Sequence, residues 1–329
     1  MNYRNWKTAI TAFLTAQMIS LLGSSLVQYA IIWHITLTTS SGKMLTISTL
    51  CGFLPQILIS LIAGVWIDRY NRKKLIMLAD AAIAASTLLL AVAFLMGYRY
   101  NWALFIVLAI RSAGTGIQTP AVNAVIPQIV PQKHLMQVNG IQNTLTSLIM
   151  FLSPAVSGAI LSVSTLETTL FIDVFTALIG VGITSALTIP GYRKDMMAGS
   201  DNAGRKDGLK SRDNIKESSG ILSMKQGFLY LKTDSFVRHL LLFQIAVLFL
   251  ISPSAFLTPL MVSRTFGPEV WRLTASEMTY SMGSVLGGIL ITSWGGFKKR
   301  LKTTVLAGWL YGVLMAGLGV APVFLFYLA

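Results

Sequence analysis

Residues 44–96 have the sequence MLTISTLCGFLPQILISLIAGVWIDRYNRKKLIMLADAAIAASTLLLAVAFLM, in which two apolar blocks flank one short polar loop. Each block, Met44–Ile67 and Leu75–Met96, is long enough for the roughly 20 residues of helix that cross a bilayer. Backbone amides in lipid must form hydrogen bonds within the protein, and uninterrupted blocks of this length exclude the shorter strands of a barrel. The stretch therefore predicts two membrane-spanning helices joined by a tight loop.

The same pattern continues along the whole chain. Hydrophobic residues make up 54% of the 329 positions and charged residues 12%, whereas a soluble domain carries about 25% charged residues. We therefore predict an all-α polytopic membrane protein with about nine transmembrane helices. A basic start could also belong to a signal peptide, but the first apolar block is too long for a signal core. The nine predicted spans are Thr8–Thr36, Met44–Ile67, Leu75–Met96, Trp102–Val122, Val138–Val163, Thr168–Ile189, Phe236–Ser263, Leu273–Trp294 and Thr303–Leu328.

Positive charge sets the expected orientation. With the N-terminus in the cytoplasm, only Lys43, Arg99, Arg264 and Arg272 of the 26 lysines and arginines fall outside, and Arg111 lies within a helix. The others gather in cytoplasmic segments, as the positive-inside rule predicts. The net charge of +14 is thus explained by topology and by contact with anionic lipid headgroups, and it calls for no nucleic acid.

A polar segment interrupts the series of short loops. Gly191–Lys225 is rich in Gly, Ser, Lys and Asp and lacks any apolar period, a composition typical of a flexible linker. We therefore divide the chain into a six-helix N-terminal half (1–190), a cytoplasmic linker (191–232) and an incomplete C-terminal half of three helices (233–329).

The loop after the second span carries a recognisable motif. Gly64-x-x-x-Asp68-Arg69-x-Asn71-Arg72-Lys73 resembles the signature loop of the major facilitator superfamily, in which a second Gly normally stands where Asn71 stands here. Asn is a mild departure because it also tolerates left-handed backbone. Further segments resemble the macrolide-efflux branch of that superfamily. They are Asn5-Trp6-Lys7, Gly52-Phe53-Leu54-Pro55, Arg111-Ser-x-Gly114-Thr, Thr119-Pro120-Ala121-x-Asn123-Ala124-Val125 and Ser153-Pro154-Ala155-Val156.

The resemblance implies a proton-driven exporter of hydrophobic drugs in the bacterial inner membrane, most simply a monomer. Its expected mechanism is alternating access, with a small hydrophobic substrate held near mid-membrane between two six-helix halves. The sequence adds that no Gly-x-x-x-x-Gly-Lys-Ser/Thr loop is present, so an ion gradient rather than ATP or another cofactor would supply the energy. Residues expected to line an apolar cavity, or alternatively to face lipid, are Trp33, Phe53, Phe94, Met150 and Phe256.

In the family, the signature loop acts as a cytoplasmic gate. Carried over to this chain, the resemblance makes Gly64, Asp68, Arg69, Arg72 and Lys73 the gating residues, with Asp68 latching against the other half in one state. Gly64 is expected to allow close helix packing. Asp68 and Arg72 are four residues apart, which suits an ion pair if the helix extends that far. The alternative is that this basic loop is a plain positive-inside anchor.

Four charged residues within or near spans are candidates for proton coupling: Arg111, Asp80, Asp173 and Glu277. A charge at a helix centre costs about 2.5–3.5 kcal/mol on insertion scales, so Arg111 should face the bundle and have a partner. It matches a family arginine that the resemblance links with coupling, although it could instead reach toward an interface. Asp80 could equally be structural, because it lies near the cytoplasmic edge. Asp173 and Glu277 lie close to the outer ends of their spans.

The fifth span contains a motif similar to the family's antiporter signature. Ser153-Pro154-x-x-x-Gly158 has Ser where Gly usually precedes Pro. Proline opens the backbone ladder and glycine one turn later permits close helix contact, so the motif indicates either a bend at a moving interface or a simple packing feature.

Two alternatives to an exporter remain open. The family has twelve spans, and the chain ends at Ala329 inside an apolar block, so we expect the last three spans to be missing and transport by the chain alone to be weak or absent. The chain would then be a non-transporting membrane component, truncated or completed by other helices. The second alternative is a facilitator of another solute, such as a metabolite or siderophore. An enzyme is not expected, because the histidines form no metal motif and Cys51 is the only cysteine.

Overall fold

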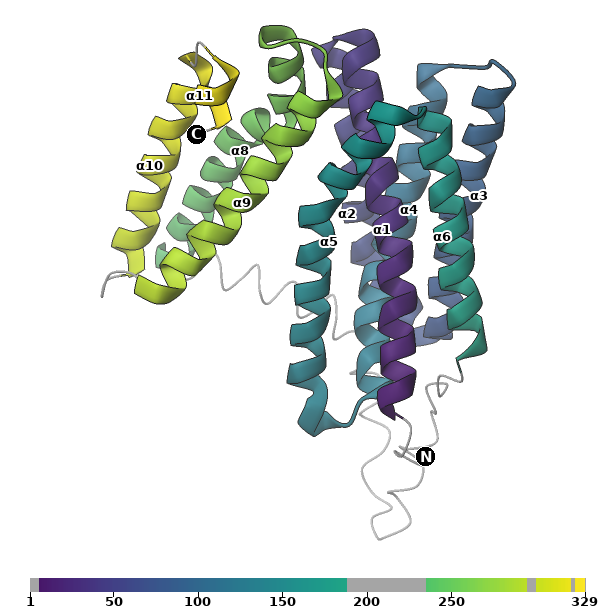
Figure 1. Cartoon of the computed structure of the whole chain (residues 1–329). Helices are drawn as coiled ribbons and strands as arrows, with labels where there is room; N and C mark the ends of the chain where they lie inside the picture. Colours follow the sequence, from purple (N-terminus) through teal and green to yellow (C-terminus); the bar gives the residue numbers. More distant parts are fainter. Residues whose placement is uncertain (1–5, 188–234, 295–299, 321–322, 329) are drawn as a thin grey trace. The chain divides into compact units, whose positions relative to one another are not determined.

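The computed structural model describes residues 6–187, 235–294, 300–320 and 323–328, and every regular element in these ranges is a helix (Figure 1). The chain divides into two compact units. One contains residues 1–191 and 256–329, and the other contains residues 192–255. The linker predicted at 191–232 lies outside the described residues.

Six long helices form the N-terminal part of the first unit, as predicted. All six are long and apolar enough to cross a membrane. Their ends differ from the predicted span ends by only a few residues, except that α4 continues well beyond Val122. The helices are α1 (Trp6–Thr39), α2 (Gly42–Arg69), α3 (Arg72–Leu95), α4 (Asn101–Ile129), α5 (Leu135–Val163) and α6 (Leu166–Ala186).

The C-terminal part of the chain contains α8 (Ser235–Thr265), α9 (Val270–Trp294), α10 (Arg300–Val320) and α11 (Phe324–Leu328). The prediction of one continuous span at Thr303–Leu328 is wrong, because α10 ends before Pro322 and a short separate helix follows. Proline lacks a backbone N–H and interrupts helices. Six helices of the described residues meet the length and hydropathy requirements for a membrane span, so the predicted total of about nine is not confirmed.

Helix periodicity explains how the six N-terminal helices pack. On α3, residues spaced three or four apart are buried, from Ile76 through Asp80 and Ile83 to Thr87 and Leu90. Such spacing places side chains on one helix face. This face contacts α4 and α6, while α2 lies along α4, and α1 lies between α5 and α6 (Figure 1).

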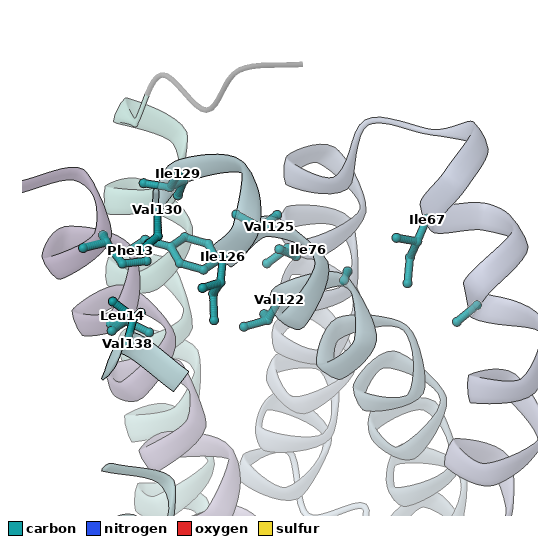
Figure 2. Packing of buried hydrophobic residues seen from close by; sticks show 13 residues of the cluster. Phe13, Leu14, Ile67, Ile76, Val122, Val125, Ile126, Ile129, Val130 and Val138 are labelled. Atoms are coloured by element: carbon teal, nitrogen blue, oxygen red, sulfur yellow. The ribbon is translucent and has the colours of Figure 1, made fainter. Parts of the chain in front are cut away.

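Two apolar clusters fill opposite ends of this bundle. The first, shown in Figure 2, joins Phe13 and Leu14 of α1 to Ile76 of α3 and Val125 and Ile126 of α4. The second cluster lies farther along the same helices, toward the other end of the bundle. Its members include Val27 and Ile31 of α1, Leu90 and Phe94 of α3, Leu104 and Leu108 of α4, and Leu170 of α6. Several polar side chains lie between the two clusters, and they form the site described below.

Helices α2 and α4 approach closely at a proline. Pro55 interrupts the backbone ladder of α2, and the backbone N–H of the next residue, Gln56, donates to Ser112 Oγ of α4 (2.9 Å). One turn along α4, a Cβ added at Gly116 would lie 2.7 Å from the carbonyl oxygen of Gln56. Glycine is therefore required at position 116 by the backbone of the neighbouring helix.

We expect Gly116→Ala to destabilise the bundle by about 1–3 kcal/mol, because the added methyl group meets backbone that cannot rotate away. Gly140→Ala is the matched control, since a Cβ at Gly140 has no atom within 4 Å and alanine favours helix by about 1 kcal/mol. Thermal unfolding of the purified protein in detergent measures both. Equal melting temperatures for the two variants would contradict the proposed close contact.

Candidate functional site

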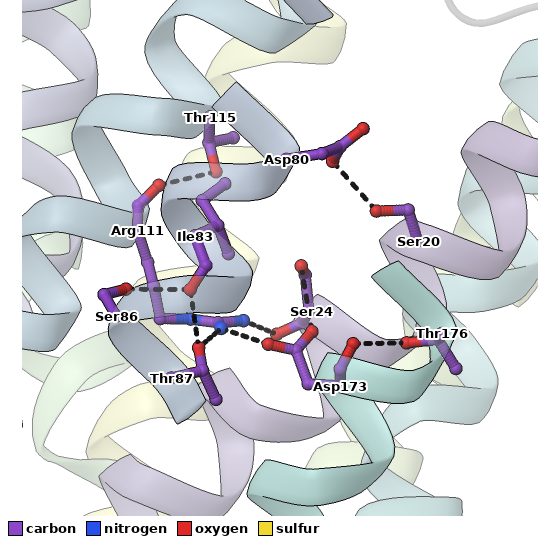
Figure 3. A network of polar contacts seen from close by, with 10 residues as sticks. All are labelled: Ser20, Ser24, Asp80, Ile83, Ser86, Thr87, Arg111, Thr115, Asp173 and Thr176. Carbon is purple, nitrogen blue, oxygen red and sulfur yellow. Dashed lines mark hydrogen bonds and ion pairs between the residues drawn. The ribbon is translucent and has the colours of Figure 1, made fainter. Parts of the chain in front are cut away.

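A layer of polar side chains crosses the bundle between its two apolar clusters (Figure 3). Helix α1 supplies three of these residues at positions i, i+3 and i+7, a spacing that places them on one face. Most of the layer is buried. The members are Gln17, Ser20 and Ser24 of α1, Asp80 and Thr87 of α3, Arg111 and Gln118 of α4, and Asp173 of α6.

Arg111 is the centre of this polar layer. Its side chain is 5% exposed and forms an ion pair with Asp173, whose side chain is 1% exposed. Arg111 Nη1 also donates to Thr87 Oγ1 (2.6 Å), and Nη2 donates to the carbonyl oxygen of Ser24 (3.0 Å). Arg111 thus binds three other helices, and the alternative in which it reaches toward an interface does not fit this burial.

Asp80 occupies the same layer in a different environment. It is 2% exposed, and its Oδ1 accepts hydrogen bonds from Ser20 Oγ (2.9 Å) and Gln118 Nε2 (2.7 Å). Its second oxygen, Oδ2, is buried without a hydrogen-bond partner, and so is Nε2 of Gln17. Both donors to Asp80 are uncharged. The two buried aspartates of the layer therefore differ in electrostatics, one being paired with a cation and the other being bound by neutral groups.

Three of the four predicted coupling candidates thus lie in one layer. Asp173, which was expected close to the outer end of its span, lies two turns from the start of α6 and pairs with Arg111 of α4. Glu277 lies on α9 and is half-buried, and the contacts described for Arg111, Asp80 and Asp173 do not include it.

The signature loop forms the turn between α2 and α3. Asn71 has φ −66° and ψ 113°, and its side chain accepts from the backbone N–H of Lys74. The backbone of Asn71 is therefore extended rather than left-handed, and Asn71 acts as the N-cap of α3. The condition for a helical Asp68–Arg72 pair is also not met, since α2 ends at Arg69 and α3 begins at Arg72.

Two basic residues of this loop bind helix carbonyls in the same bundle. Arg72 Nη1 donates to the carbonyl oxygen of Ala124 in α4 (2.7 Å). The neighbouring carbonyl, of Asn123, has no helical donor, because Pro127 four residues later lacks a backbone N–H. Lys73 Nζ donates to the carbonyl oxygens of Ser185 and Leu187 (both 2.7 Å). The last carbonyls of a helix lack internal partners and favour cations, so Lys73 caps the C-terminus of α6.

Gly64 does not make the close contact that was expected. A Cβ added there would meet no atom within 4 Å, so nothing in the described part of the chain packs against it. Glycine at position 64 is not required by packing within the six-helix bundle.

The motif on α5 lies at a helix interface. Ser153, which precedes Pro154, donates from its Oγ to the carbonyl oxygen of Ile149 in the same helix (2.6 Å). Ser157 Oγ donates to the carbonyl oxygen of Leu26 in α1 (3.1 Å). A Cβ added at Gly158 would overlap the side chain of Thr274 in α9. The glycine thus permits close contact between α5 and α9, as both interpretations of the motif require.

A cavity of about 330 Å³ lies beyond the second apolar cluster, where α1 and α3 end and α6 begins. An ion pair between Arg99 and Glu167 (2.9 Å) stands at its wall. Of the predicted substrate-lining residues, Phe94 lines this cavity, whereas Trp33 is fully buried in another apolar cluster, Phe53 packs against Phe256, and Met150 is exposed. The remaining lining residues are His34, Leu37, Thr38, Leu161, Ser164, Thr165, Leu166 and Val270.

Comparison with known proteins agrees with this architecture. Residues 9–329 match the family model of the Major Facilitator Superfamily. The chain belongs to this superfamily of membrane transporters. It is 31% identical over 321 residues to macrolide efflux protein A of Streptococcus pyogenes, covering 97% of this chain and 75% of that protein. Identity to macrolide efflux protein A of Enterococcus faecalis is 31% over 283 residues, or 86% of this chain and 82% of that protein.

The superfamily fold also appears in a solved structure that is similar to this one. This is the crystal structure of a bacterial homologue of the human lysosomal transporter Spinster, in an inward-facing and unoccupied conformation. The TM-score is 0.62 at 14% sequence identity, and the match covers 89% of this chain and 64% of the other. At this identity the likeness shows the fold alone.

The sequence analysis did not identify four of the uncharged residues in the polar layer. Ser20, Ser24, Thr87 and Gln118 were not singled out, although each follows an acidic, basic or amide residue of the layer at a helical spacing of three or seven residues. Asp80 and Thr87 are seven apart, as are Arg111 and Gln118, which places each pair on one helix face. This shared spacing is the pattern by which they could have been found.

Breaking the Arg111–Asp173 pair should destabilise the bundle. We expect Arg111→Met and Asp173→Leu each to lower the free energy of unfolding by about 3–5 kcal/mol, because each leaves one buried charge unpaired. The double variant should lose less than the sum of the two, since no unpaired charge remains. Thermal unfolding in detergent measures all three.

Arg99→Ala provides the matched control, because Arg99 belongs to an ion pair but is 66% exposed. An exposed pair contributes about 0–1 kcal/mol. Strict additivity of the Arg111 and Asp173 substitutions would show that the two side chains do not interact.

Proposed function

We propose that this chain is a secondary transporter that exports hydrophobic drugs of the macrolide class in exchange for protons. The proposal is supported by 31% identity to two macrolide efflux proteins along nearly the whole chain. It is also supported by the buried polar layer, because ionisable residues inside a membrane bundle are costly and are typical of ion pathways. The burial of two aspartates, Asp80 and Asp173, in one layer with Arg111 is the single structural observation that carries this argument.

Alternating access is the proposed mechanism. Residues 1–190 would be one six-helix half and residues 233–329 would provide three helices of the other, joined by the cytoplasmic linker at 191–232. The loop containing Gly64, Asp68, Arg69, Arg72 and Lys73 would gate the cytoplasmic end. Ser153, Pro154 and Gly158 would let α5 bend and shift against α9. Proline opens the backbone hydrogen-bond ladder of the helix, and glycine allows the two helices to lie close together. The protein would act as a monomer.

Export is tested in a drug-susceptible bacterial host. Cells expressing the chain should accumulate less radiolabelled erythromycin than cells with an empty vector, and a protonophore should abolish the difference because it collapses the proton gradient. Efflux that survives the protonophore would contradict proton coupling. Efflux that appears only when further helices of a longer relative are co-expressed would favour the alternative of a membrane component completed by another chain.

The proposed topology places the N-terminus and the α2–α3 loop in the cytoplasm. In a Cys51→Ser chain, Lys74→Cys should react with a membrane-impermeant maleimide only after the cells are opened, whereas Tyr98→Cys should react in intact cells. Lys74 and Tyr98 are exposed and lie at opposite ends of α3, so each variant is the control for the other. The reverse labelling pattern would overturn the orientation.

A further inference from the structure

The buried layer contains one more acid than it has cations among the described residues. Arg111 is the cation, and its Nη1 bonds Asp173. Asp80 receives hydrogen bonds only from Ser20 and Gln118, both neutral. An ionised carboxylate buried without a counter-ion is strongly unfavourable, and in practice such a group binds a proton instead. The two aspartates of this layer therefore have different electrostatic roles.

We propose that Asp80, with Ser20, Gln17 and Gln118, is the site that binds the exchanged proton, while Arg111 and Asp173 remain an ionised structural pair. This inference rests on the proposed proton-coupled export, and it names the ligand and the residue that holds it. The proton comes from water on one side of the membrane, joins Asp80 Oδ2, and leaves to water on the other side.

The hydrogen-bonding capacity around Asp80 fits both protonation states. Oδ1 is already bound by two donors, whereas Oδ2 is buried without a partner, so the free oxygen is the one that can take the proton. Gln17 is the adjacent amide, because its Oε1 and Asp80 Oδ1 both lie within range of Gln118 Nε2, at 3.4 and 2.7 Å. Nε2 of Gln17 is likewise buried and unpartnered.

The Gln17 amide can therefore serve each state of Asp80. In this proposal a protonated Oδ2 would donate to Gln17 Oε1, and an ionised Oδ2 would accept from Gln17 Nε2 after rotation of the amide. Neither contact is formed in the structure, where Oδ2 and Nε2 both lack a partner. Ser20 and Gln118 keep the first oxygen in place throughout.

The charged groups around Asp80 support its assignment over that of Asp173. The charged group that acts on Asp80 is the carboxylate of Asp173 on α6. The positive charge of Arg111 on α4 is engaged with Asp173, Thr87 and the carbonyl of Ser24 instead. The α1 residues nearest to it, Gln17 and Ser20, are uncharged. Protonating Asp173 would leave Arg111 as a buried cation without an anion, which is costly, whereas protonating Asp80 removes an unpaired charge.

The direct test is infrared difference spectroscopy between acidic and alkaline pH on the purified chain in liposomes. The wild type should show the carbonyl stretch of a protonated, buried carboxylic acid, and Asp80→Asn should lack it. Asp80→Glu should retain a shifted band, because it keeps an acid at this position. Glu269→Gln is the matched control, since Glu269 is an exposed acid, and it should leave the band unchanged. Identical spectra for wild type and Asp80→Asn would overturn the inference.

A transport measurement separates this inference from the proposed function. In liposomes with an imposed pH gradient, Asp80→Asn should reduce gradient-driven erythromycin transport by at least about tenfold, within the usual range of coupling between sites. Erythromycin binding should remain, because Asn matches the shape of a protonated Asp. Gradient-driven transport that is equal in wild type and Asp80→Asn would refute the Asp80 site and leave proton-coupled export intact.

A wild type that ignores the gradient would instead refute the proposed coupling, while the infrared band would still decide whether Asp80 holds a proton. Thermal unfolding shows that any loss is not a folding defect, since Asp80→Asn should melt close to the wild type.

Discussion

A guanidinium inside a lipid-embedded helix bundle is tolerated only where an anion and several acceptors surround it. Arg111 meets this condition with groups from three other helices, namely Asp173 of α6, Thr87 of α3 and the Ser24 carbonyl of α1. Neither α3 nor α6 can slide along α4 without separating a buried charge from its partner. This one residue therefore fixes the relative register of four helices, and the positions of the other polar side chains follow from it.

The apolar clusters on both sides increase the strength of these interactions. Phe13 and Ile126 on one side and Ile31 and Leu108 on the other are nearly or fully buried, so the polar layer lies in a low-dielectric region. Hydrogen bonds and ion pairs are stronger there, and an unpaired polar group costs more. The same clusters that support the Arg111 pair thus make the unpartnered oxygen of Asp80 a significant energetic feature rather than a minor one.

Much of the helical architecture could be predicted from apolar block length, because the bilayer imposes a minimum span on each helix. Positions 6–187 confirm this helix by helix. The pairing of Arg111 with Asp173 could not be predicted, since the two are distant in sequence and their contact depends on helix rotation and register. The N-cap role of Asn71 was not predicted, because the sequence argument considered only the tolerance of asparagine for left-handed backbone and not its tendency to cap helices. In the structure Asn71 precedes the start of α3 and caps it.

The α2–α3 loop shows why its two interpretations, anchor and gate, do not exclude each other. Arg72 and Lys73 hold carbonyls of α4 and α6 at one end of the bundle, so they connect three helices into a rigid unit on that side. A gate that moves relative to another half needs such a rigid base, because a flexible loop would absorb the motion without transmitting it. The positive charges that favour the cytoplasmic side thus also stiffen the end of the bundle at which gating is proposed.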